Sequence, residues 1–109
     1  MVEYNRQLDL MFTALSDSTR RDILTRVAKI EMSIGEIAEH YKMTFAGIAK
    51  HVIVLERAGL VTKKRRGKEQ VVIIVPSSLN LARSHIEQYA KMWGDRFDRL
   101  EILLKEEQQ

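Results

Sequence analysis

The sequence has no cysteine, a single proline and no long hydrophobic run. The missing cysteines exclude disulfides, thiolate metal sites and thiol-based redox sensing. The longest aliphatic run, VVIIV, is far too short to span a bilayer. The start of the chain, MVEYNRQLDLMF, also lacks the basic segment and unbroken apolar run of a signal peptide. We therefore expect a soluble, cytoplasmic protein without membrane association.

The sequence patterns of enzymes and metal sites are also missing. It contains no glycine-rich phosphate loop, no paired carboxylates and no nucleophile next to a base. His85 has no second histidine at a helical repeat, and His40 has only Glu36 one turn away. Two ligands on an exposed helix do not make a zinc site. We expect no catalytic site, no metal and no cofactor.

Charge is unevenly distributed along the 109 residues, although the net charge is only +3. Between Lys42 and Lys68 the chain is strongly basic, and Glu56 is the acidic residue that opposes this charge before Glu69. From Asp95 onward, acidic residues outnumber basic ones. This asymmetry indicates one face that binds a polyanion.

Several segments carry apolar residues at helical spacing. The first is predicted at about 3–15, and the second follows the polar capping residues SDST. Ser33 and Glu36 form a possible capping box at the start of a third, short helix. Thr44 is expected to cap a fourth helix, which Gly59 ends in a left-handed conformation.

The rest of the chain predicts a hairpin and a long helix. LVTKKR and QVVIIV are rich in β-branched residues and flank a glycine-containing turn. Two short helices joined by a tight turn and followed by a hairpin are typical of a winged helix-turn-helix. We predict a mostly α fold with a small β-hairpin, in the order α-α-α-α-β-β-α. It forms one domain over 1–109, with the helix-turn-helix at about 33–58, the wing at about 60–75 and a final helix at about 79–106.

The fourth helix and the hairpin together predict a DNA-binding surface. At about 100° per residue, Phe45 falls with the buried residues Ile48 and Val52, and Lys50 falls on the outward side. A helix fits the major groove, and a basic ribbon beside it reaches the neighbouring phosphates. The predicted DNA-binding residues are Thr44, Phe45, Ala46, Ala49, Lys50, His51, Lys63, Lys64, Arg65, Arg66 and Lys68.

The last helix has a longer and more aromatic apolar stripe than a domain of this size needs for its own core. Burial of this stripe in a twofold interface with the first helix explains it. Such a dimer also places two recognition helices about one DNA turn apart, for a pseudo-palindromic site. The predicted interface residues are Leu8, Met11, Phe12, Leu15, Ile86, Tyr89, Trp93, Phe97, Leu100 and Leu104.

Nearly the whole chain resembles a known family. ALSDSTRRDILTRVA, then SIGEIAEHYKMTFAGIAKHVIVLERAGLV and a basic wing, resemble the ArsR-type winged-helix repressors. The ending YAKMWGDRFDRLEILLKE is similar to a branch whose final helix carries tryptophan followed by arginine and leucine. The resemblance implies a homodimeric transcriptional repressor that dimerises through its first and last helices. The cysteines with which many members bind metal are missing here.

The recognition helix departs from the family's pattern. The family usually opens this helix with serine, glutamine, proline and a small residue, and has a serine before the basic position. The corresponding residues here are Thr44, Phe45, Ala46, Gly47 and Ala49. Ala46 and Ala49 can touch only a thymine methyl group, while Lys50 and His51 remain as hydrogen-bonding candidates. We therefore expect the wing and DNA shape to supply more of the specificity.

Two other functions fit parts of the sequence. A protein-interaction module would use the apolar residues of the fourth helix, Phe45, Ala46, Ala49 and Ile53, on a protein partner. A nonspecific DNA-binding protein would use the basic tip without a preferred sequence. The missing polar readers slightly favour the protein-interaction module, whereas the basic wing argues against it. We therefore expect sequence-specific binding to double-stranded DNA, as a transcriptional repressor.

Overall fold

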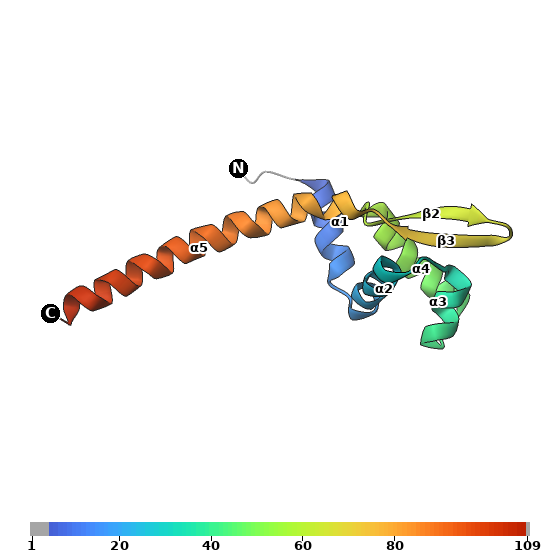
Figure 1. The fold of residues 1–109 in the computed structure, drawn as a ribbon, viewed down its shortest axis with the longest axis horizontal. Helices are drawn as coiled ribbons and strands as arrows, with labels where there is room; N and C mark the ends of the chain where they lie inside the picture. The colour runs from blue at the N-terminus through green and yellow to red at the C-terminus, as the bar shows by residue number, and fades with distance from the viewer. Residues whose placement is uncertain (1–4, 109) are drawn as a thin grey trace. The chain divides into compact units, whose positions relative to one another are not determined.

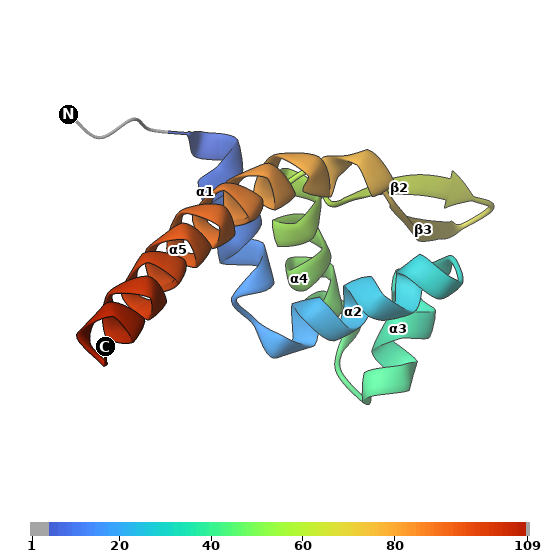
Figure 2. The same cartoon turned by 60° about the vertical axis from the view of Figure 1, so that its left-hand side comes forward.

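The computed structural model describes residues 5–108 and is shown from two directions in Figures 1 and 2. The chain divides after Leu79 into two units, of which the second consists of one helix. The elements are α1 (Arg6–Leu15), α2 (Ser18–Lys29), β1 (Met32–Ser33), α3 (Ile34–Tyr41), α4 (Phe45–Arg57), β2 (Val61–Arg66), β3 (Glu69–Ile74), the 3-10 helix η1 (Pro76–Leu79) and α5 (Asn80–Glu107).

The first unit is a winged helix-turn-helix, as predicted. The helices α3 and α4 pack against each other, and α4 also contacts the strand β2 (Figure 1). Large aliphatic side chains from the helices and the sheet fill the core between them. Those that are almost completely buried are Ile23, Ile37, Ile48, Val52, Leu55, Leu60, Val71 and Val72.

The sheet corrects the predicted order of elements, because it has three strands and not two. β1 pairs antiparallel with β3, so the spatial order is β1-β3-β2. β1 contains only Met32 and Ser33. An alternating pattern cannot be recognised in two residues, and a pairing partner about 40 positions away leaves no local signal. The hairpin β2–β3 itself is as predicted.

Local sequence signals explain most helix boundaries. Asn5 caps α1; the predicted helix start at Glu3 lies outside the described residues. The predicted capping box is present, because Ser33 Oγ accepts from the Glu36 amide at 3.1 Å and the Glu36 carboxylate accepts from the Ser33 amide at 3.2 Å. Gly59 follows α4 with a φ of 77°, the left-handed conformation that was predicted for it.

The hairpin tip is a two-residue turn between Arg66 and Glu69, which face each other across the strands. Gly67 has a φ of 64°. Tight hairpin turns need a positive φ because their twist must match that of the strands, and glycine reaches it without steric cost. The turn therefore places Lys68 next to the basic residues at the end of β2.

The helix α5 spans Asn80–Glu107, close to the predicted 79–106. Its 28 residues correspond to a length of about 42 Å at 1.5 Å per residue. Among its described residues, Ala82 is the one that is buried. A long run of its large apolar side chains is exposed instead, from Ile86 to Leu104.

Candidate nucleic-acid interface

The recognition helix α4 is positioned by its cap and by the turn before it. Thr44 Oγ1 accepts a hydrogen bond from the Gly47 amide at 3.0 Å, which satisfies one of the free amides at the helix start. Lys42, between α3 and α4, has a φ of 55°. This left-handed residue reverses the chain between the two helices and so sets the direction in which α4 starts.

A polar cluster fixes α3, the helix before the turn, to α2. The Tyr41 hydroxyl donates to Asp22 Oδ2, and Arg26 Nε donates to the same carboxylate at 3.1 Å and to the Tyr41 oxygen at 3.0 Å. The guanidinium carbon of Arg26 also lies 5.5 Å from the centre of the Tyr41 ring. The hydrogen bond from Tyr41, followed by that from Arg26, lowers the pKa of the Asp22 carboxyl. The cluster holds the last residue of α3 in place immediately before the turn.

The exposed side of α4 is mostly apolar. Phe45 is 59% exposed, which corrects its predicted place on the buried side of the helix. It lies in the first turn, beyond the buried residues that begin at Ile48. Ala46 and Lys50 are also exposed, and Ala49 is half-buried. The outward side of the first two turns thus carries an aromatic ring, small side chains and one ammonium group.

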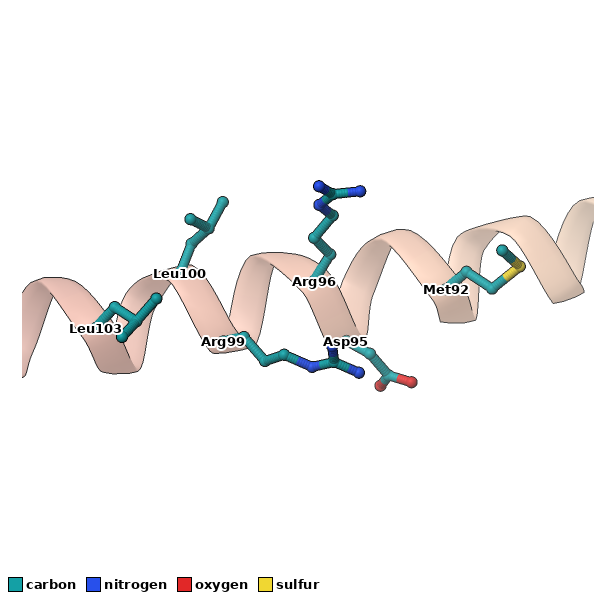
Figure 3. Close-up of a pocket in the computed structure, with 6 residues that line it drawn as sticks. All are labelled: Met92, Asp95, Arg96, Arg99, Leu100 and Leu103. Atoms are coloured by element: carbon teal, nitrogen blue, oxygen red, sulfur yellow. The ribbon is translucent and has the colours of Figure 1, made fainter.

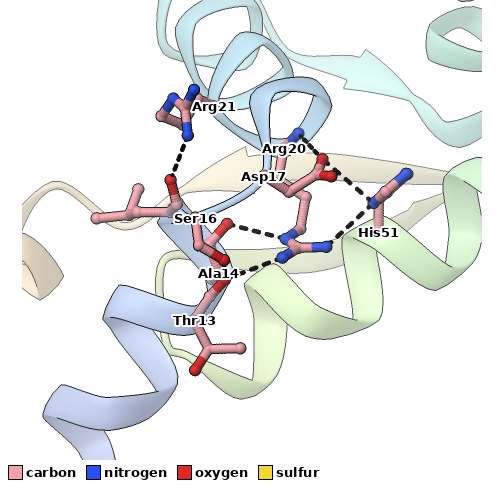
Figure 4. A network of polar contacts seen from close by, with 8 residues as sticks. Thr13, Ala14, Ser16, Asp17, Arg20, Arg21 and His51 are labelled. Carbon is pink, nitrogen blue, oxygen red and sulfur yellow. Dashed lines mark hydrogen bonds and ion pairs between the residues drawn. The ribbon is translucent and has the colours of Figure 1, made fainter.

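His51 does not lie on the outward side of α4 but takes part in a network of polar contacts within the protein (Figure 4). Its Nδ1 lies 3.4 Å from Arg20 Nη1 and 3.9 Å from Asp17 Oδ2, and its side chain is 22% exposed. The Arg20 amide, followed by the Arg20 and His51 charges, lowers the pKa of Asp17 against the opposing effect of burial. The network connects α4 with the start of α2. It thereby engages His51, one of the two residues that were predicted to form hydrogen bonds with bases.

Arg20 extends the same network to α1. Its Nε donates to the Ala14 carbonyl at 2.8 Å and its Nη2 to the Thr13 carbonyl at 2.9 Å. Arg21 Nη1 donates to the Leu15 carbonyl at 2.8 Å. Both arginines satisfy carbonyls in the last turn of α1, where helical partners are missing. Figure 4 shows the Arg20 guanidinium between these carbonyls and His51.

The basic residues of the wing differ in how freely they can bind phosphate. Lys63 Nζ lies 3.3 Å from Glu56 Oε1, so this lysine is paired with the end of α4. Arg65 Nε donates to the Gly67 carbonyl at 3.0 Å, but its side chain is exposed. Lys64, Arg66 and Lys68 are exposed as well. The tip therefore carries four exposed cations, next to one lysine that joins the wing to the recognition helix.

The predicted dimer residues are placed unequally. Met11 is 2% exposed, so little of it is left for a partner, whereas Phe12 is exposed and Leu8 and Leu15 are half-buried. All predicted residues of α5 are exposed: Ile86, Tyr89, Trp93, Phe97, Leu100 and Leu104. Met92 and Leu103 widen this apolar surface. Figure 3 shows Met92 and Leu103 on α5 between Arg96 and Leu100, which point to one side in this view, and Asp95 and Arg99, which point to the other.

Within 5–108, no three histidine or carboxylate side chains come together as a metal site. In the same part of the chain, no helix is both long and apolar enough to cross a bilayer. The space beside α5 in Figure 3 is bounded by side chains of that single helix, so it is an open surface and not a ligand cavity.

Sequence reasoning missed the contacts that connect elements. The Asp22–Tyr41 and Arg20–His51 contacts join residues 19 and 31 positions apart, and the Glu56–Lys63 pair joins a helix to a strand. Periodicity reports which side of one element is buried, not which polar groups meet. The one available signal was the SDST segment, in which Asp17 was recognisable as a possible helix cap.

A capped recognition helix beside a basic hairpin defines the winged helix-turn-helix class of DNA-binding proteins. The sequence profile of a helix-turn-helix domain family matches residues 15–64. The chain is 43% identical to YuzN, an HTH-type transcriptional regulator of Bacillus subtilis, over 76% of this chain and 99% of that protein. It is 36% identical to the transcriptional repressor SdpR of the same species, over 53% of this chain and 64% of that protein.

Solved structures agree with this assignment. An ArsR-like transcriptional regulator from Rhodococcus is 29% identical, with a TM-score of 0.75 over 89% of this chain and 92% of that one. A homodimeric winged helix-turn-helix DNA-binding domain from Mycobacterium bovis is 21% identical and shares the fold, with a TM-score of 0.64 over 84% of this chain and 91% of that one. The chain belongs to the ArsR-type family of winged helix-turn-helix regulators, and it is a DNA-binding transcriptional regulator.

Proposed function

We propose that this regulator is a homodimeric repressor that binds a pseudo-palindromic operator and blocks a promoter. The whole chain acts as one winged helix-turn-helix domain, in the cytoplasm, without metal or cofactor. The observation that carries the proposal is that the exposed first turns of α4 and the exposed cations of the hairpin tip belong to the same unit, in which Lys63 of β2 is paired with Glu56 of α4. The relatives include a protein named as a repressor and a fold relative described as homodimeric.

In this proposal α4 lies in the major groove and the wing holds the neighbouring backbone. Lys50 is the exposed residue of the first two turns of α4 that can donate to a base edge. The start of α4, capped by Thr44, faces a phosphate with its free amides. The exposed cations Lys64, Arg65, Arg66 and Lys68 neutralise phosphates, and Lys63 keeps the wing in position against Glu56.

Replacing Arg65 and Arg66 together with alanine tests the wing. Each phosphate contact releases counterions, so the logarithm of the binding constant falls with the logarithm of salt concentration by about 0.9 per contact. We expect the double variant to bind all duplexes more weakly and to reduce this slope by about two units. The measurement is a mobility-shift titration at several salt concentrations, on a duplex that covers the region upstream of the protein's own coding sequence.

The matched control removes the same charge elsewhere. Arg83 and Lys105 are exposed on α5, where they pair with Glu87 and Glu101. Their double replacement with alanine is expected to leave the salt slope unchanged. If both double variants behave alike, the wing is not a phosphate-binding element. Transcription from the same duplex in vitro then separates a repressor, which lowers the transcript level on binding, from an activator.

A further inference from the structure

The exposed side of α4 is poor in groups that form hydrogen bonds. Ala46, Lys50, Ile53 and Arg57 follow one another at spacings of four, three and four residues, so they form one outward stripe. Ile53 is 37% exposed. Phe45 adjoins this stripe at the start of the helix. Three of these five side chains are apolar.

Several polar groups of α4 are engaged in contacts within the protein, although a recognition helix would normally use such groups to contact bases. His51 Nδ1 faces Arg20 and Asp17. Glu56, further along the helix, is paired with Lys63. Thr44 Oγ1 accepts from the Gly47 amide as a cap. Specific hydrogen bonding to base edges is therefore reduced to Lys50 within the first two turns.

An apolar helix surface can still distinguish base pairs in the major groove. The donors and acceptors of the base edges need polar partners, but thymine also presents its 5-methyl group, to which Ala, Thr and Phe side chains make apolar contacts. The other three bases have no such group in unmodified DNA. An exposed ring and small apolar side chains at the start of a recognition helix match this one apolar feature of the groove.

We propose that α4 recognises thymine 5-methyl groups through Phe45, Ala46 and Ile53, so that each half of the operator contains thymines whose methyl groups are required for tight binding. The inference rests on the proposed function, because it requires α4 to enter the major groove. It goes further by naming the chemical group that is read and by making Phe45 a specificity-determining residue.

Charge complementarity selects duplex DNA, and not an apolar protein surface, as the occupant of this side of α4. Lys50 and Arg57 lie within the stripe itself, and the exposed cations of the wing belong to the same unit. A polyanion that carries apolar groups satisfies both the cations and the apolar side chains. A thymine-rich groove has this combination, since the methyl groups lie between two rows of phosphates.

The wing is compatible with thymine-rich sites. Runs of A·T pairs have a narrow minor groove with an enhanced negative potential, which attracts inserted arginine side chains. Arg65 and Arg66 lie next to the hairpin turn and are exposed. A wing that favours A·T pairs and a helix that favours thymine methyl groups select the same kind of sequence.

The test begins with a selection from a pool of duplexes with a randomised central segment, from which the tightest binder is recovered. Thymine is then replaced with uracil at one position at a time, which removes the methyl group and keeps the hydrogen-bonding edges. We expect affinity to fall about fourfold at each contacted position, from the transfer free energy of one buried carbon. Placing 5-methylcytosine at such a position is expected to bind more tightly than placing cytosine there.

The variant Phe45→Ala connects the effect to α4. It should reduce the ratio between the affinities for the thymine and uracil duplexes towards one at the positions that contact Phe45. The matched control is Ile30→Ala, which removes another exposed apolar side chain of the same unit, outside α4. This control should keep the full ratio. Circular dichroism of both variants checks that they fold alike.

The outcomes separate the inference from the proposed function. If uracil replaces thymine everywhere without loss of affinity, or if 5-methylcytosine gives no gain over cytosine, methyl recognition is wrong while the salt-dependent binding through the wing stands. If Phe45→Ala keeps the full ratio, Phe45 is not the specificity-determining residue. If no duplex is enriched and Arg65 and Arg66 do not affect binding, the proposed operator fails, and the inference fails with it.

Discussion

Tyr41 illustrates how a single residue connects two helices of the DNA-binding unit. Its hydroxyl donates to Asp22 on α2, and Arg26 donates to both residues. Burial, and then the hydrogen bond to Asp22, raise the pKa of Tyr41, whereas the hydrogen bonds lower the pKa of Asp22. The cluster is therefore complete in the pH range in which Tyr41 is neutral and Asp22 is ionised.

The pKa of Asp22 predicts part of the acid sensitivity of the fold. Because this pKa is lower in the folded than in the unfolded chain, the stabilisation is full above the unfolded value of about 3.9 and is lost as the pH falls through the folded value. Asp17 behaves in the same direction. We expect Asp22→Asn to flatten part of the decrease in melting temperature on acidification, while Asp17 retains the rest. Thermal unfolding between about pH 2 and 6 measures this.

The control for this experiment is Asp98→Asn, the same chemical change on the exposed surface of α5. It should keep the acid dependence of the original protein. An Asp22→Asn variant whose melting temperature falls with pH as steeply as that of the control would remove the cluster from the explanation. At alkaline pH the effect of Tyr41 on stability runs in the opposite direction. Because its pKa is raised in the folded chain, its contribution to stability is lost as the pH rises through the folded value.

At the residue scale, the sequence predicted contacts that are local and failed where partners are distant. The capping box of Ser33 and Glu36 is confirmed, because both residues belong to one helix turn. The prediction for Phe45 was wrong, since helical periodicity assigns it to the buried side but cannot show that the core ends before the first turn. The internal network of His51 depends on Arg20, which another helix supplies.

At the scale of elements, the turn between α3 and α4 determines the direction of the recognition helix. Lys42 adopts a left-handed conformation there. For a residue with a side chain this conformation costs roughly 1–2 kcal/mol relative to the right-handed one. This conformation could not be predicted from the sequence, because lysine is not a typical residue for a positive φ and a short segment between two helices can close in several ways.

Replacing Lys42 with glycine tests the strain in this turn. Glycine reaches a positive φ without steric cost, so we expect the folded protein to gain up to about 1 kcal/mol, after the greater freedom of the unfolded chain is subtracted. For a domain of this size that corresponds to an increase in melting temperature of about 4–8 °C. The matched control, Lys29→Gly, changes a right-handed residue in the last turn of α2 and should instead lower it.

The two variants of this turn experiment have opposite expected signs, so a general effect of glycine or of lost charge cannot imitate the result. A Lys42→Gly protein that melts below the original would show that the turn gains more from the lysine side chain than it loses in backbone conformation.

The small strand β1 also belongs to the scale of elements. It was not predicted, because two residues cannot show an alternating pattern, although it completes the sheet beside β3.

At the scale of the whole molecule, the long helix α5 carries the proposed dimer interface. Its exposed apolar side chains extend over most of a helix about 42 Å long. The sequence predicted this stripe correctly, because a helix of 28 residues repeats its period many times. Periodicity within one chain reports that the stripe is apolar but not which surface packs against it.

Substituting aspartate for both Trp93 and Leu100 tests this interface. Trp93 is 65% exposed in the single chain, and both side chains lie on the stripe, so two charges there would be buried against the partner at a high cost. We expect the original protein to sediment as a dimer and the variant as a monomer. The control places aspartate at Lys91 and Ser84, which face away from the stripe, and should remain dimeric.

In the monomeric variant, each half of a pseudo-palindromic operator has to be bound by a separate copy. We therefore expect this variant to need a much higher concentration to occupy the duplex, and its salt slope to be near half that of the dimer. An original protein that sediments as a monomer would contradict the twofold interface, and a monomer that still occupies the duplex at the original concentration would show that each copy binds independently.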